Sequence, residues 1–384
     1  VMSDETFNAA SAEVKVQGFS IHPGEAKNKL KNAARIAAEY ISLLPAEQTP
    51  EHTEGREGFI HLTGMKGATE QASLSFILRD HDRAKLAEKY EVGVTPYAGL
   101  QISSDGTKKY LFPVKCSHKR GLNVHVAEEE LETSAIEAVM IPDDDRATLC
   151  VSSQAGCRMG CKFCMTGRQG FHGHMSAADI ISQFIAVDES DRLTNAVFMG
   201  MGEPLDNYDN VMRAIEILTA DWGFAWSPKR ITLSTIGVLP NLKRYLDECK
   251  CHLAVSLHDP FAPERLSVMP VQGAWPIQEV IDLIKQYDFT GQRRVSFEYT
   301  MFAGFNDTKA HADALFRMLK GLECRMNLIR FHKIPDFPYE TSPDLIIENF
   351  KTRLNNLGVT TTVRASRGED ILAACGMLAG EHKE

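Results

Sequence analysis

Residues 146–171 read RATLCVSSQAGCRMGCKFCMTGRQGF and contain Cys157, Cys161 and Cys164 in the pattern C-x3-C-x2-C. Cysteine thiolates hold iron–sulfur clusters, and three of them can ligate three irons of a [4Fe–4S] cluster while the fourth stays open to a cosubstrate. Gly156 precedes this run and Gly160 lies within it, and both let its backbone bend around a cluster. Structural zinc is the alternative, but it usually takes four ligands and often shows a second C-x-x-C pair, which this sequence lacks.

Beyond the cysteines, hydrophobic runs alternate with helical patterns to the end of the chain. Because strands that alternate with helices form parallel sheets, six βα units predict either an open doubly wound sheet or a partial TIM-like barrel. The candidate strands are 196–200, 230–234, 252–256, 294–300, 326–330 and 360–364. The candidate helices lie around 177–187, 208–220, 239–248, 277–287, 308–320 and 343–356.

Upstream of the cysteines, 100–114 and 135–141 predict an antiparallel hairpin, with a polar insertion at 116–134 between them. A short charged helix is expected at 81–92, and a domain boundary within it. Before that boundary, strand, helix, strand and strand patterns at 12–19, 25–43, 59–63 and 72–79 predict a small α+β sheet with a helix on one face. The predicted domains are therefore residues 1–82, 83–145 and 146–384.

The composition narrows the class of protein. The 42 Lys and Arg residues against 51 Asp and Glu give a net charge of −9, which excludes nucleic-acid binding by bulk positive charge but not by a local basic groove. No apolar run is long enough for a membrane helix, and the first residues lack the pattern of a signal peptide. Three of the nine cysteines fall within eight residues, which favours a cofactor in a reducing cytoplasm over a disulfide framework.

Six ordered motifs sharpen the interpretation. The cysteine stretch resembles the radical S-adenosylmethionine (SAM) enzymes, and residues 84–380 resemble their dual-specificity RNA methyltransferases of the RlmN/Cfr type. The other motifs are GMGEPLDN (200–207), KRITLSTIGV (229–238), HLAVSLHDP (252–260), CRMNLIRFHKIP (324–335) and RASRGEDILAACGML (364–378). The resemblance implies a partial (β/α)6 TIM-like radical SAM barrel, preceded by the antiparallel hairpin and the amino-terminal βαββ domain.

The resemblance also implies the cofactors and their contacts. The cluster ligands would be Cys157, Cys161 and Cys164, and the open iron would chelate the amino and carboxylate groups of SAM, of which each turnover consumes two. The family's SAM contacts match Gly202, Glu203, Ser234, Ser256, Leu257, His258 and Asn327. Among these, Gly202 would allow a close backbone approach and Glu203 would bind the SAM amino group.

Two cysteines and one carboxylate match the family's catalytic residues. An adenine ring carbon that carries hydrogen is too weak a nucleophile to take a methyl group directly from SAM, so a thiolate accepts it first. Cys375 matches that methyl-carrying cysteine, Cys150 matches the cysteine that releases the product by forming a disulfide, and Glu137 matches the proposed base. Without the motif, each cysteine would be interpreted as a small buried apolar residue and Glu137 as an exposed strand carboxylate.

The amino-terminal segment departs from that family. Residues 5–82 resemble the lid, or dimerisation, domain of peptidase T, an M20 aminopeptidase, with His22-Pro23-Gly24 as the most specific motif. The peptidase's two-zinc catalytic residues are not found, so no peptidase activity is expected. The segment is instead expected to promote formation of a homodimer through its sheet edge or helix.

The leading hypothesis is a cytoplasmic methyltransferase of adenine carbon 2 in 23S ribosomal RNA, with transfer RNA as a second substrate and an electron donor such as flavodoxin. Basic residues expected near the mouth of the site are phosphate-contact candidates: Arg168, Lys229, Arg230, Arg293, Arg364 and Arg367. The alternative is a chimeric or impaired protein that binds the cluster and SAM without efficient RNA methylation, its amino-terminal domain serving only dimerisation.

Overall fold

The computed structural model describes residues 8–22, 24, 26–27, 29–81, 94–116, 132–221, 223–291 and 293–380. The chain divides into two compact units, Val1–Gly93 and Val94–Glu384. The helix expected at 81–92 and most of the insertion expected at 116–134 lie outside the described residues. No helix in the described part of the chain is both long and apolar enough to cross a membrane.

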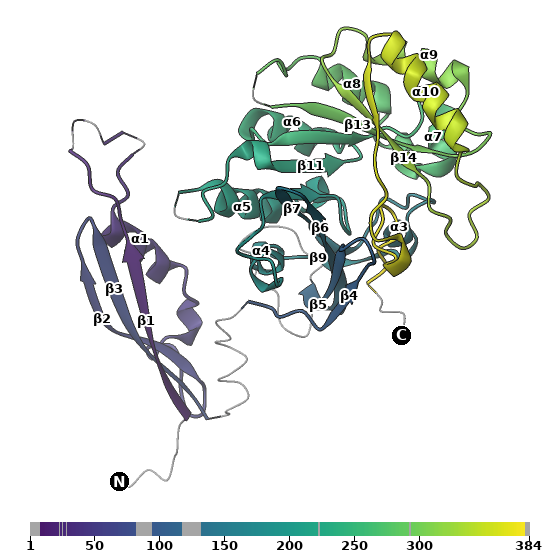
Figure 1. Ribbon diagram of the computed structural model, residues 1–384. Coiled ribbons are helices and arrows are strands. Elements are labelled where there is room, and N and C mark those ends of the chain that lie inside the picture. The colour runs from purple at the N-terminus through teal and green to yellow at the C-terminus, as the bar shows by residue number, and fades with distance from the viewer. Residues whose placement is uncertain are drawn as a thin grey trace, which may run out of the picture. The chain divides into compact units, whose positions relative to one another are not determined.

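The first unit is a three-stranded antiparallel sheet with one helix on its face (Figure 1). Its elements are β1 (Asn8–Gln17), α1 (Ala33–Ser42), β2 (Phe59–Gly67) and β3 (Gln71–Asp80), with β3 in the centre. Ala33 and Ala37 of α1 are fully buried against Leu74 and Phe76 of β3, and such small helix residues allow close packing. The predicted βαββ order is confirmed.

Helix α1 is shorter than the predicted 25–43. Residues Phe19 and Lys31 exchange two backbone hydrogen bonds of 2.8 and 3.0 Å, which holds the chain extended just before the helix. Asn32 then caps α1 by accepting a hydrogen bond from the Arg35 backbone N–H at 3.2 Å. Periodicity alone could not distinguish this extended approach from a first helical turn.

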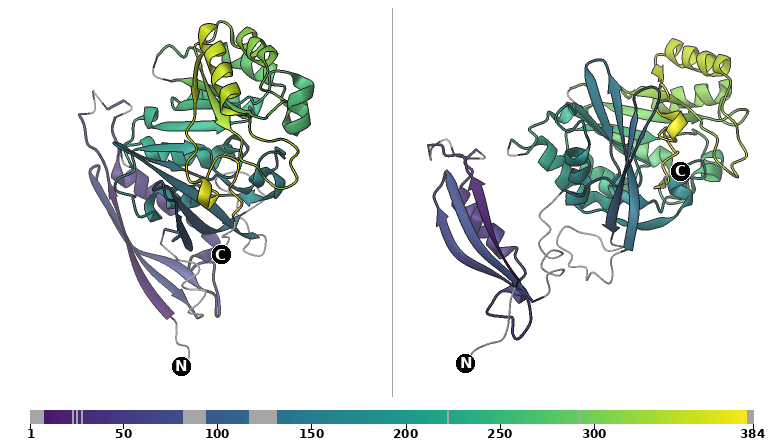
Figure 2. Two further views of the ribbon diagram at one scale, coloured as in Figure 1. Left: turned by 45° about the vertical axis from the view of Figure 1, so that its right-hand side comes forward. Right: turned by 60° about the horizontal axis from the view of Figure 1, so that its bottom comes forward.

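The second unit is built on one ten-stranded sheet (Figures 1 and 2). Seven strands run parallel in chain order: β7 (Arg146–Cys150), β10 (Asn195–Phe198), β11 (Ile231–Thr235), β12 (His252–Ser256), β13 (Val295–Met301), β14 (Arg325–Arg330) and β15 (Thr360–Val363). A doubly wound sheet would reverse this order at a switch point. The strand order therefore selects the partial barrel, and all six predicted strands are confirmed within two residues.

Helices occupy the connections between these strands. They are α3 (Met165–Arg168), α4 (Ala177–Ala186), α5 (Tyr208–Thr219), α6 (Leu239–Glu248), α7 (Ala262–Val268), α8 (Ile277–Ile284), α9 (Lys309–Leu319) and α10 (Asp344–Asn356). The short α3 and α7 were not predicted. Strands β8 (Gln154–Gly156) and β9 (Phe171–His174) form a separate ribbon beside the cysteine loop.

The predicted hairpin continues the barrel sheet. Strands β5 (Lys108–Cys116) and β6 (Glu132–Asp143) pair as expected, and β6 pairs with β7, so that Tyr110, Phe112 and Ile136 share the barrel's apolar core. The predicted single strand 100–114 is wrong, because it turns at Asp105-Gly106 into β4 (Gly99–Ile102) and β5. Gly106 has a φ of +82°, and this Asp-Gly pair is a turn signal that was available in the sequence.

Candidate active site

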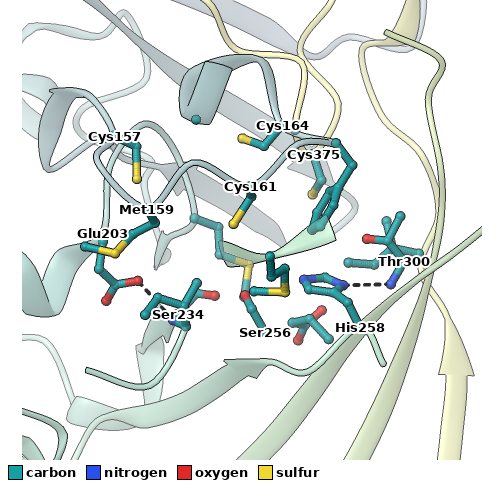
Figure 3. Close-up of a pocket in the computed structure, with 18 of the residues that line it drawn as sticks. Cys157, Met159, Cys161, Cys164, Glu203, Ser234, Ser256, His258, Thr300 and Cys375 are labelled. Carbon is teal, nitrogen blue, oxygen red and sulfur yellow. Dashed lines mark hydrogen bonds between the residues drawn. The ribbon is translucent and has the colours of Figure 1, made fainter. Parts of the chain in front are cut away.

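One pocket opens at the carboxyl ends of the parallel strands, where barrel enzymes build their sites. Its empty volume, including the open mouth, is about 960 Å³. Nine of the expected site residues line it together, as Figure 3 shows for those it labels: Cys157, Cys161, Cys164, Gly202, Glu203, Ser234, Ser256, His258 and Cys375. The fold thus brings residues that lie more than 200 positions apart in the sequence into one cavity.

The three clustered cysteines lie on the loop between β8 and α3, and none of them forms a disulfide. Gly156 and Gly160 both have a φ of +65°, which confirms that glycine lets this loop bend. Burial raises the pKa of all three thiols, and the charges of neighbouring thiolates raise it further. Three thiolates gathered on one pocket wall need a positive centre, so this donor set fits an iron–sulfur cluster.

Gly202 and Glu203 follow β10. Gly202 has a φ of +98°, and a Cβ there would lie 2.5 Å from the Gln154 Cβ, so the close approach it permits is to the chain itself. Glu203 is 3% exposed and accepts hydrogen bonds from the Thr235 hydroxyl at 2.6 Å and the Ile236 backbone N–H at 2.9 Å. Burial nevertheless raises the pKa of Glu203 to about 7, because desolvation outweighs these hydrogen bonds.

His258 follows β12 and lines the pocket, and a hydrogen bond fixes its tautomer. Its Nδ1 accepts a hydrogen bond from the Thr300 backbone N–H at 2.9 Å, so the neutral ring carries its proton on Nε2 (Figure 3). Burial lowers the pKa of His258 to about 3, with Arg265 contributing, so the ring stays neutral. His258 also has a φ of +56°, an uncommon conformation for a residue with a side chain.

Two of the expected SAM contacts do not line the pocket. Leu257 is fully buried in the apolar core. The Asn327 side-chain amide donates to Glu298 Oε1 at 2.8 Å and supports that carboxylate from behind. Glu298, which the sequence interpretation missed, lines the pocket and is 3% exposed. A charge inside the otherwise uncharged and mostly buried strand VSFEYTM was the available signal.

Arg364 connects this carboxylate to the two catalytic cysteine candidates. Its guanidinium lies 3.3 Å from Glu298 Oε2 and lines the pocket. Burial lowers the pKa of Arg364, but Glu298, Cys375 and Cys150 outweigh it and raise the pKa. Burial, together with the charge on Cys375, raises the pKa of Cys150 to about 12, and Arg364 opposes that rise.

Cys375 is exposed and lies on a carboxy-terminal segment that docks against the cysteine loop. The Met165 backbone N–H donates to the Gly376 carbonyl at 2.8 Å, and the Thr166 hydroxyl donates to the Leu378 carbonyl at 2.7 Å. These bonds hold Cys375 beside the helix that follows Cys164. Figure 3 shows Cys375 and Cys164 near one another at the pocket.

Glu137 lies outside the lining of this pocket and is 1% exposed. Its Oε1 forms an ion pair with Lys109 Nζ at 2.8 Å. Its Oε2 accepts hydrogen bonds from the backbone N–H groups of Ala379 at 2.8 Å and Gly380 at 3.1 Å. The carboxylate therefore anchors the segment that carries Cys375.

Three of the basic residues expected near the mouth lie at the opposite edge of the sheet. Lys229 and Arg230 precede β11, and Arg293 precedes β13, where the amino ends of the parallel strands lie. Arg293 also donates to the carbonyls of Leu246 and Cys249. The expectation that they lie near the mouth of the pocket is wrong. The direction of a strand decides at which edge of the sheet a residue lies, and its proximity in sequence to a motif does not.

Comparison with known proteins agrees with this geometry. Residues 151–316 match the family described as the Radical SAM superfamily. A probable dual-specificity RNA methyltransferase RlmN of Porphyromonas gingivalis is 53% identical over 83% of this chain and 89% of its own length. A protein of the same description from Parabacteroides distasonis is 56% identical over 77% of this chain and 82% of its own length.

A solved structure is similar over the same region. The crystal structure of a radical SAM methyltransferase from Sphaerobacter thermophilus has a TM-score of 0.68 and 38% identity, covering 78% of this chain and 85% of that chain. At the other end, residues 4–91 match the family described as the peptidase dimerisation domain. This match confirms the second resemblance, and the two families occupy different units of the chain.

Proposed function

The chain belongs to the RlmN family of radical SAM RNA methyltransferases, and we propose that it methylates carbon 2 of an adenine in 23S ribosomal RNA through a methyl group first carried by Cys375. Members of the superfamily use a [4Fe–4S] cluster and SAM, and Cys157, Cys161 and Cys164 would hold the cluster here. When bound, the cluster supplies the electron that cleaves SAM to a 5′-deoxyadenosyl radical.

The observation that supports the proposal is that Cys375 lines the same pocket as the three cluster cysteines and the expected SAM residues. A sulfur atom can accept a methyl group from SAM only if the cosubstrate reaches it, and one shared cavity allows this. The exposure of Cys375 also leaves its sulfur accessible to an RNA base.

The residues around Cys375 suit a reaction that begins with methylation of the Cys375 sulfur and ends with a disulfide at the same sulfur. Arg364 interacts electrostatically with both Cys375 and Cys150, and its positive charge opposes the rise in the pKa of Cys150. Glu203 offers a buried carboxylate to the amino group of SAM, and the neutral His258 offers an N–H donor. Once the carbon carried by Cys375 is joined to the adenine, Cys150 would attack the Cys375 sulfur. The S–S bond would form as the bond between that sulfur and the carbon breaks, and the carbon would take up a proton as the methylated base leaves.

Glu137 can serve as the base only after a rearrangement. Both of its oxygens are engaged, by Lys109 and by the backbone of Ala379 and Gly380. We propose that release of this segment frees Glu137 Oε2 when RNA enters the site. In the present arrangement Glu137 fixes the position of the Cys375 segment.

Anaerobic single turnover tests the proposal. The cluster-loaded chain would be incubated with SAM, dithionite and a 23S rRNA fragment, and the nucleosides identified by mass spectrometry. We expect 2-methyladenosine with the parent chain and with Cys324→Ala, a cysteine outside the pocket, and none with Cys375→Ala. Only 8-methyladenosine, or methylation that survives Cys375→Ala, would contradict the proposal. Methyl on Cys375 with unmodified RNA would support the impaired-protein alternative.

We also propose a homodimer through the first unit. Ile36 and Tyr40 of α1 and its C-cap residue Leu43 are 42%, 40% and 66% exposed and lie at helical spacing. The match of this unit to a dimerisation domain supports their burial against a second copy. Sedimentation equilibrium of the full chain should give a dimer, and Leu43→Glu should shift it toward monomer; a monomeric parent chain would contradict this.

A further inference from the structure

A second potential metal-binding group lies outside the pocket, behind the strand end that carries His258. Asp259 follows β12, Glu264 belongs to α7 and His311 belongs to α9. One ligand atom from each lies within 4.8 Å of the other two, and in the described part of the chain no other group of three meets that spacing. Glu264 Oε2 is 2.8 Å from His311 Nε2, and Asp259 Oδ2 is 3.8 Å from the same nitrogen.

The Asp259 carboxylate is incompletely satisfied. The side chain is fully buried, and its Oδ1 accepts a hydrogen bond from the Phe261 backbone N–H at 2.7 Å. Its Oδ2 is buried without any hydrogen-bond partner and faces the gap to His311. A buried carboxylate oxygen without a partner is costly, so this atom points to a missing positive group.

The neighbouring cation does not fill this role. Arg265 uses its guanidinium to donate to the carbonyls of Leu257 at 2.9 Å and Ser256 at 3.0 Å, and to Gln272 Oε1 at 2.7 Å. Even a protonated Oδ2 could not form a hydrogen bond with His311, because Oδ2 and His311 Nε2 are 3.8 Å apart.

We propose that Asp259, Glu264 and His311 bind one divalent first-row transition cation. Two carboxylate oxygens and one imidazole nitrogen suit Mn²⁺, Fe²⁺ or Zn²⁺. The spacings of 2.8 and 3.8 Å are close to those between neighbouring ligands of one ion with bonds of about 2.1 Å. The half-exposed side chain of Glu264 gives the ion a path from solvent and leaves positions for water.

The outer contacts orient the imidazole for this role. Thr308 Oγ1 lies 2.7 Å from His311 Nδ1, so Nδ1–H can donate to the hydroxyl and leave the Nε2 lone pair for the cation. The Phe261 ring packs edge-on against His311 at 4.9 Å between centroids. A bound cation would join α7 and α9 to the residue after His258 and so stabilise that side of the pocket.

Mn²⁺ binding to the cluster-loaded full chain tests the proposal, because loading occupies the cysteines and Mn²⁺ prefers oxygen and imidazole ligands. Electron paramagnetic resonance would count bound Mn²⁺, and its pulsed form would detect coupling to an imidazole nitrogen. We expect one Mn²⁺ per chain with that coupling, displaced by Zn²⁺.

The variants Asp259→Asn and His311→Gln should each weaken Mn²⁺ binding at least about tenfold, and His311→Gln should also abolish the nitrogen coupling. Glu279→Gln, at an exposed carboxylate of α8, is the matched control and should bind as the parent does. Glu264→Gln provides a third test if either buried variant fails to fold. Absence of bound Mn²⁺ in the parent, or binding and coupling unchanged in a folded variant, would overturn the proposal.

Discussion

The cysteine loop and the carboxy-terminal segment reach the same pocket but are held differently. The loop is fixed by its own backbone: Gly156 leaves no room for a side chain, since a Cβ would lie 2.1 Å from the Gly170 carbonyl oxygen, and Cys157 is 9% exposed. The segment around Cys375 is held by one backbone hydrogen bond from Met165 and by side chains of other elements, among them Thr166 and Glu137, and Cys375 itself is exposed. A cradle for a cluster can be permanent, whereas a sulfur that must meet both SAM and RNA needs a support that can release it.

The largest effect is expected from a substitution in the cysteine loop. Cys161→Ala should lose the bound cluster and all RNA methylation, because the remaining two thiolates cannot hold three irons. Iron content and the visible absorption of the cluster check the first loss, and nucleoside analysis checks the second. Cys324→Ala should keep both. Full iron content and turnover in Cys161→Ala would contradict the assignment of the loop.

The second-largest effect is expected at Glu137, which holds the segment that carries Cys375. Glu137→Gln leaves the Lys109 ammonium, 4% exposed, without its counter-charge, and removing one partner of a buried pair costs about 3–5 kcal/mol of unfolding free energy. The amide oxygen can still accept from Ala379 and Gly380, so the loss reports on the ion pair. Urea denaturation measures it, and the double variant Glu137→Leu with Lys109→Met should recover most of the stability. A loss near zero for Glu137→Gln would show that the pair is hydrated.

Glu203, which lines the pocket, should make the affinity for SAM depend on pH. The pKa of Glu203 is raised to about 7, so below that pH the carboxyl is mostly protonated and must lose a proton to bind the amino group of SAM. Affinity should therefore rise about tenfold per pH unit from pH 5.5 toward 7 and level off above it. Isothermal titration calorimetry checks this, with Glu203→Gln expected to bind weakly and without the dependence. An affinity that falls as pH rises would contradict it.

The same raised pKa of Glu203 should make the stability of the folded chain fall as the pH rises, whereas the affinity for SAM rises. The folded chain without SAM holds the Glu203 proton more tightly than the unfolded chain does, so this group's contribution to stability is present below pH 4.5 and is lost as the pH rises through about 7. The parent chain should thus lose stability over that range relative to Glu203→Gln. Urea unfolding at pH 5 and pH 8 compares the two chains.

The smallest expected effect concerns one tether of the segment. Thr166→Val removes the hydrogen bond to the Leu378 carbonyl and should cost about 1 kcal/mol, which corresponds to roughly fivefold faster opening of the segment. Hydrogen exchange at the Ala379 and Gly380 amides would detect it, while Thr166→Ser should exchange as the parent does. Equal exchange in Thr166→Val would mean that this bond does not restrain the segment.

The same contrast explains what could be predicted from the sequence. Strands β10 to β15 were predictable because each is a short run containing apolar or β-branched residues between helical patterns, and Gly156 and Gly160 indicated where the loop bends. The roles of Arg364 and Glu298 were not, because a charge gains its function from which strands become neighbours. Leu257 and Asn327 show the converse, since residues within a motif can point behind the pocket wall.

Methylation of Cys375 tests the central claim most directly. The cluster-loaded chain would be incubated with methyl-labelled SAM under reducing conditions, with and without the rRNA fragment, and the Cys375 peptide and the RNA analysed by mass spectrometry. The account predicts label on Cys375, and its appearance as 2-methyladenosine when RNA is present. An unlabelled Cys375 together with no cleavage of SAM in a protein that contains its full cluster would contradict the account.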